Sequence, residues 1–96
     1  MERLAAGDRA GGEAALERAV SWDPGQWVAM NNLAWLCVEA GRVAEARAWM
    51  DRALANEDAR NNAGVWDTEA AVRRAEGNEE GARDAERRRD GLKNAE

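Results

Sequence analysis

Apolar residues return every three or four positions through most of the chain, which is the spacing of one face of an α-helix. The pattern predicts five helices, at about residues 13–22, 27–40, 43–56, 63–76 and 79–93. It is clearest in the second and third, whose stripes are Met30, Leu33, Ala34 and Cys37, then Ala46, Trp49, Met50, Ala53 and Leu54. Because β-branched residues are few and proline occurs once, we expect an all-α protein.

Short breaks separate the predicted helices and determine how they pack. Asp23-Pro24-Gly25 ends the first helix, because proline disfavours helical geometry in the residue before it. Gly41 ends the second as a candidate left-handed cap, and the third begins about two residues later. Helices joined by so short a turn must be antiparallel neighbours. Residues 56–62 are polar and predict a loop, whereas the last helix has few apolar residues and should be the least stable.

The same residue types recur at a fixed distance along the chain. Three residues repeat 36 positions further on, since Ala34, Gly41 and Ala46 are followed by Ala70, Gly77 and Ala82, while Ala53 is followed by Arg89. A second spacing, of 34 positions, links Gly41, Met50, Ala53 and Leu54 back to Gly7, Leu16, Ala19 and Val20. A period near this length predicts stacked helical hairpins, which present surfaces to partners.

The middle copy carries a recognisable set of residues, namely Asn32-Leu33-Ala34, Gly41, Ala46, Met50 and Ala53-Leu54. With these residues it resembles a tetratricopeptide repeat. The resemblance implies one domain, residues 1–96, built as a short right-handed α-solenoid of antiparallel helix hairpins with about two and a half repeats. It implies a half repeat at 1–26 with its turn at Gly7, a repeat at 27–60 and a degenerate terminal repeat at 61–94. Glu69 and Arg89 depart from the family pattern, which predicts a solvated outer face for the terminal repeat.

In that family the first helix of each hairpin lines a concave groove, so the resemblance implies a groove here. The residues expected in it are Asn31, Asn32, Trp35 and Val38, with Val28 and Glu39, from the middle repeat, and Asp67 and Arg74, with Thr68 and Ala71, from the last. The asparagine amides could hold a peptide backbone, and Trp35 with Val38 could form an apolar anchor pocket. Arg74 could pair with a carboxylate. In the alternative interpretation, Trp35 fills space against the neighbouring hairpin.

Composition argues against catalysis. The chain has no histidine or tyrosine, one serine, one threonine and one lysine, so a nucleophile with an adjacent base is not available outside the carboxylates. Cys37, the one cysteine, lies on an apolar stripe and is predicted to be a packing residue. One cysteine without histidine also leaves a zinc site short of ligands. We therefore expect a non-enzymatic protein with no catalytic residue, no metal and no cofactor.

Charge narrows the class of partner. A net charge of −5 argues against nucleic acid as the main ligand. The one basic run, Arg87-Arg88-Arg89, lies among acidic residues and is interpreted as a solvated helix face. No apolar run approaches the roughly 18 residues of a membrane span. Since the N-terminus also lacks the apolar region of a signal peptide, we expect a cytoplasmic protein without a membrane partner.

Three functions fit these observations. The first is a protein–protein interaction module that binds a peptide or protein segment in the groove. The second is an assembly or oligomerisation subunit, or a fragment of a longer solenoid, with the groove occupied. Leu16, Ala19 and Val20 lack a full partner helix in the half repeat, which predicts self-association as a homodimer. The third is RNA binding, because the middle copy is also similar to a pentatricopeptide repeat; the acidic charge and Asp23-Pro24 argue against it.

Overall fold

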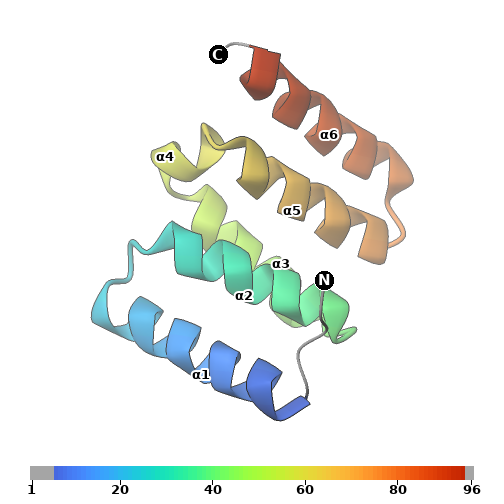
Figure 1. The fold of residues 1–96 in the computed structure, drawn as a ribbon. Coiled ribbons are helices and arrows are strands. Elements are labelled where there is room, and N and C mark those ends of the chain that lie inside the picture. Colours follow the sequence, from blue (N-terminus) through green and yellow to red (C-terminus); the bar gives the residue numbers. More distant parts are fainter. Residues whose placement is uncertain (1–5, 95–96) are drawn as a thin grey trace.

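A computed structural model describes residues 6–94, with side chains described from residue 11 onward. Over that range the regular elements are helices: α1 (Ala6–Trp22), α2 (Trp27–Glu39), α3 (Val43–Leu54), α4 (Glu57–Arg60), α5 (Ala63–Ala75) and α6 (Glu79–Asn94). In Figure 1, α1, α2, α5 and α6 lie in a row, and α3 lies behind α2. This is the stack of helical hairpins expected for a helical repeat.

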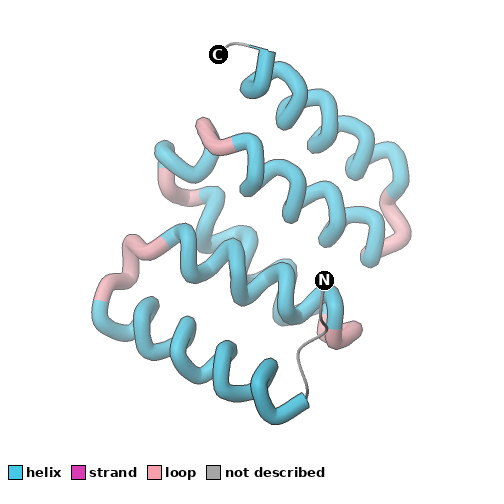
Figure 2. The backbone as a smooth tube through the Cα atoms, in the orientation of Figure 1, coloured by secondary structure: helices cyan, strands magenta, loops and turns pink. Residues whose placement is uncertain are grey.

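Both principal hairpin turns close in the same way. Gly41 after α2 and Gly77 after α5 have φ of 77° and 82°, in the left-handed region where an L side chain is strained. The N–H of Gly41 donates to the Val38 carbonyl, and that of Arg42 donates to the Cys37 carbonyl at 2.8 Å. The second turn repeats this pair of hydrogen bonds, the Schellman pattern that satisfies the last carbonyls of a helix. The predicted cap at Gly41 is confirmed, and Figure 2 shows how short these connections are.

Small residues allow the helices to approach each other. Ala34 on α2, Ala46 on α3 and Ala82 on α6 are fully buried. Helix axes about 8–10 Å apart leave little room for larger side chains where they cross. The buried residues form three clusters in series along the stack: one between α1 and α2 around Leu33, one around Ala34 and Met50, and one in the terminal hairpin around Trp66.

Two predicted breaks in the helical pattern are wrong. Gly7 was expected to form the turn of a half repeat, but its backbone lies inside α1, which starts at Ala6. Alanine-rich sequence around it supports helix despite the cost of about 1 kcal/mol for each interior glycine. Residues 56–62, expected to be a loop, contain α4. The Asn56 side chain caps this helical turn by accepting from the Asp58 N–H at 2.8 Å, and Ala59 beneath it is buried.

Two predictions about exposure are also wrong. Glu69 was expected on a solvated outer face, yet it is 1% exposed because guanidinium groups from α3 and α5 surround its carboxylate. Leu16, Ala19 and Val20 were expected to lack a full partner helix and form an exposed apolar face, but Leu16 and Ala19 are partly buried against the cluster formed with α2, and Val20 is buried in it. The exposure of these three residues therefore gives no support to the predicted homodimer.

Candidate functional site

One side of α2 remains open to solvent. Its exposed residues are Val28, Asn32, Trp35 and Glu39, spaced by four, three and four positions. They face outward because the residues on either side of them are used for packing: Leu33 packs toward α1, and Ala34 packs toward α3 and α5. We call these four residues the α2 stripe.

Apolar side chains dominate the α2 stripe. Val28 is 50% exposed and Trp35 is 44% exposed. Trp35 belongs to none of the three buried clusters found in the described part of the chain. Large apolar side chains left in water within one stripe mark interaction surfaces, since burying each of them on binding would be favourable.

Asn31 and Val38 were predicted in the same groove, but they are not part of the exposed α2 stripe. Both are only partly exposed, and Val38 packs against the cluster around Ala34. The Asn31 Oδ1 atom is buried and has no hydrogen-bond partner among the described residues. An unsatisfied buried acceptor costs about 1–3 kcal/mol.

Asp67 and Arg74 lie on the exposed side of α5, and both are held by α6. Asp67 Oδ1 accepts from Arg89 Nη1 at 2.7 Å. Arg74 donates from Nε to Glu79 at 3.0 Å and from Nη2 to Glu86 at 3.2 Å. The hydrogen bond to Glu79, followed by that to Glu86, raises the pKa of Arg74. These ion pairs connect α5 to α6, so Arg74 is less available for a ligand carboxylate than predicted.

Comparison with known proteins agrees with this architecture. A tetratricopeptide repeat family model matches residues 3–72, from the start of α1 to most of α5. The chain belongs to the tetratricopeptide repeat family. No curated protein and no solved structure matches it. Proteins of this family generally mediate protein–protein interactions, and the match includes the whole α2 stripe.

One exposed residue of this tetratricopeptide repeat protein was missed from the sequence. Trp22, the last residue of α1, is 88% exposed. Most tryptophans pack in cores or between helices, so Trp22 did not stand out as a candidate site residue in the sequence. A signal was present, because Asp23-Pro24 follows directly and carries the chain away from α1 before α2 begins.

The described residues offer little for catalysis or metal binding. No cluster of metal-ligating side chains occurs among them. Cys37 is buried, and desolvation raises the pKa of its thiol, which disfavours the nucleophilic thiolate. None of the described helices is both long and apolar enough to span a membrane.

Proposed function

We propose that this tetratricopeptide repeat protein binds a peptide or protein segment along the α2 stripe, without catalysing a reaction. The observation that carries the proposal is the exposure of Val28 and Trp35 on one side of a helix whose other sides are packed. Such a surface suits an apolar anchor residue of a partner. Asn32 at the centre of the stripe offers an amide that can pair with a peptide backbone.

The unpartnered Oδ1 of Asn31 supports the same proposal. An acceptor that nothing in the fold satisfies is expected at a place where a ligand supplies the donor. A backbone N–H of a segment lying along α2 has the right chemistry. Asp67 and Arg74, which α6 already engages, enter the proposal only as the charged border of the groove. We retain the expectation of a cytoplasmic scaffold whose main partners are neither nucleic acid nor membrane.

A library of random twelve-residue peptides displayed on phage tests the proposal, with the full chain as bait. Peptides enriched on the wild type are synthesised, and their affinities are measured by fluorescence anisotropy. Truncation of Trp35 together with Asn32 to alanine should weaken binding at least tenfold, since a buried aromatic anchor typically carries much of the binding energy. Trp22→Ala is the matched control and should change affinity less than twofold. Equal losses in both variants would contradict the proposal.

Self-association is the second candidate, and the exposure of Trp22 favours it. A tryptophan this exposed at a helix end is available to a second copy of the chain. Sedimentation velocity at tens of micromolar distinguishes the two candidates. A dimer that Trp22→Ala converts to monomer would support self-association, and a wild type that sediments only as monomer would exclude it.

A further inference from the structure

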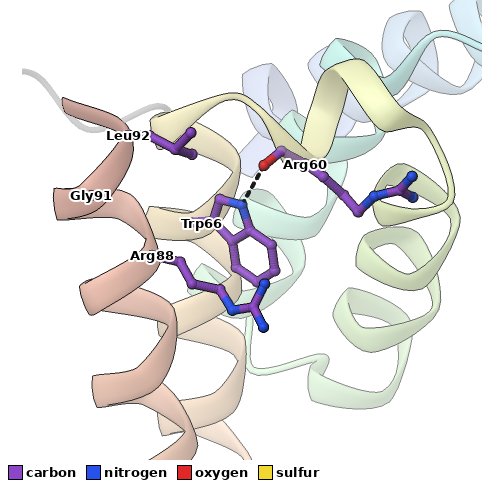
Figure 3. Close-up of a pocket in the computed structure, with 5 residues that line it drawn as sticks. All are labelled: Arg60, Trp66, Arg88, Gly91 and Leu92. Atoms are coloured by element: carbon purple, nitrogen blue, oxygen red, sulfur yellow. Dashed lines mark hydrogen bonds between the residues drawn. The ribbon is translucent and has the colours of Figure 1, made fainter. Parts of the chain in front are cut away.

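A hollow lies between α4, α5 and α6, and it shares no residue with the α2 stripe. It consists of two adjoining cavities joined at Arg88. The larger, of about 390 Å³, is lined by Arg73, Asp84, Arg87 and Arg88. The smaller, of about 220 Å³, is lined by Arg60, Trp66, Arg88, Gly91 and Leu92 and is drawn in Figure 3. We call the two together the arginine hollow.

The ring of Trp66 forms a fixed apolar wall of the hollow. It is only 6% exposed, and its indole N–H donates to the Arg60 carbonyl at 2.8 Å. The guanidinium carbon of Arg88 lies over the ring, 4.9 Å from its centre, as Figure 3 shows. Leu92 packs against the same buried cluster as Trp66. The tryptophan therefore holds Arg88 at the mouth of the cavity by a cation–π contact.

Arg88 keeps its hydrogen-bonding capacity for a ligand. It has no carboxylate partner within the part of the chain that the structure describes, although acidic residues are numerous there. Its neighbour Arg87 pairs with Asp84, which is the one acidic residue in the lining of either cavity. The sequence interpretation treated the whole run Arg87-Arg88-Arg89 as a solvated face. In the structure the three arginines differ in their partners, because Arg87 pairs with Asp84, Arg89 pairs with Asp67 and Arg88 pairs with neither.

Backbone carbonyls hold the other two arginines of the hollow, Arg60 and Arg73, in place. Arg60 donates from Nη1 to the Leu54 carbonyl at 2.6 Å, and Arg73 donates from Nη1 to the Gly81 carbonyl at 2.9 Å. These backbone contacts fix both guanidinium groups. Arg73 also donates from Nε to the Glu69 carboxylate at 2.6 Å, which balances its charge, whereas Arg60 has no carboxylate partner among the described residues. Four arginines and one aspartate thus line the hollow, and two of the arginines, Arg73 and Arg87, are paired with carboxylates. Arg60 and Arg88 carry the positive charge that has no acidic partner among the described residues.

We propose that the arginine hollow docks an acidic peptide segment of a partner protein. Carboxylates of the segment pair with Arg88 and Arg60, and one bulky aliphatic side chain enters the smaller cavity beside Trp66. Gly91 leaves room for that side chain, since a Cβ built there meets nothing within 4 Å. A nucleic acid fits the hollow less well, because it has no aliphatic side chain to enter the smaller cavity.

The probe is a fluorescein-labelled peptide, Asp-Glu-Leu-Glu-Asp, titrated with the full chain at low salt and followed by anisotropy. The neutral peptide Asn-Gln-Leu-Gln-Asn and a labelled pentauridylate serve as comparison ligands. Arg88→Gln should weaken binding of the acidic peptide about tenfold, because it removes a charge-assisted hydrogen-bonding group. Arg83→Gln removes the same charge from the exposed surface of α6 outside either cavity, and it should change affinity less than twofold. Circular dichroism of both variants should show the same helical signal as the wild type.

A second variant tests the apolar part of the hollow. Gly91→Leu fills the smaller cavity without changing charge, and it should reduce affinity for the acidic peptide at least fivefold while leaving the helical signal intact. The proposal is overturned if Arg83→Gln and Arg88→Gln have equal effects, if the neutral peptide binds as tightly as the acidic one, or if pentauridylate binds more tightly. Trp35→Ala should leave this binding unchanged, so failure here and failure of the α2 stripe are distinguishable.

Discussion

Glu69 offers the sharpest test of how the terminal hairpin is held, through the substitution Glu69→Gln. Its buried carboxylate accepts hydrogen bonds from Arg47 Nη1 at 3.1 Å to each oxygen and from Arg73 Nε at 2.6 Å. Glutamine replaces one of these oxygens with an NH₂ group that faces a guanidinium donor. A hydrogen bond to a charged group contributes about 1.5–3 kcal/mol. Both guanidinium groups are about one-quarter exposed and keep other partners, so we expect a loss of about 2 kcal/mol in the free energy of unfolding.

Thermal unfolding followed by circular dichroism at pH 7 measures this loss. For a domain of this size, a 2 kcal/mol loss corresponds to a fall in Tm of roughly 8–16 °C. Asp51→Asn is the matched control, because Asp51 pairs with the same Arg47 at 3.1 Å but is 64% exposed. We expect it to cost less than about 0.5 kcal/mol, as exposed ion pairs contribute little. Equal effects of the two substitutions would refute the claim that burial makes the Glu69 contact strong.

Two further predictions concern the pH dependence of stability and the turns. Hydrogen bonds from Arg47 lower the pKa of Glu76. The ion pair therefore stabilises the fold fully at pH values above the unfolded-state pKa of Glu76. This stabilisation is lost as the pH falls through the folded-state pKa. Glu76→Gln should therefore cost about 0.5–1 kcal/mol at pH 7 and nothing in strong acid, in thermal melts down to about pH 2; a cost independent of pH would contradict this. Gly41→Ala should lower the free energy of unfolding, measured in urea, by about 1–2 kcal/mol, because φ at Gly41 is positive. Gly91→Ala, within α6, should raise it by up to about 1 kcal/mol. Equal effects of the two substitutions would contradict the turn geometry.

The α2–α3 hairpin could be predicted because its local signals agree with its packing. The apolar stripe around Leu33 matches the residues buried in the structure, and Gly41 has the positive φ that a cap requires. The sequence around Gly7 did not show in the same way whether this glycine forms a turn or lies within a helix. A 34-residue spacing aligned it with Gly41, yet a glycine among alanines is tolerated in a helix, and no local signal separates the two cases.

The candidate site was predictable to the extent that it follows helical periodicity. Residues 28, 32, 35 and 39 are exposed because two packed sides of α2 leave one side free. The role of Arg74 was not predictable, since its partner Glu86 lies twelve positions away on another helix. Trp66 and Arg88 likewise meet only once α6 has packed against α5. Pairings across helices depend on tertiary geometry, for which a single sequence carries no periodic signal.

The terminal hairpin shows why net charge was a poor guide to local chemistry. At the repeat position where α2 has the buried Leu33, α5 has Glu69, so its packing toward α3 needs cations. Arg47 and Arg73 meet that need, and Arg73 also forms part of the arginine hollow. In a chain of net charge −5 the hollow still has two arginines, Arg60 and Arg88, without an acidic partner among the described residues, because the nearby carboxylates of Glu69 and Asp84 pair with Arg73 and Arg87. Glu69→Gln should consequently alter the hollow as well as stability, since it releases the Nε of Arg73.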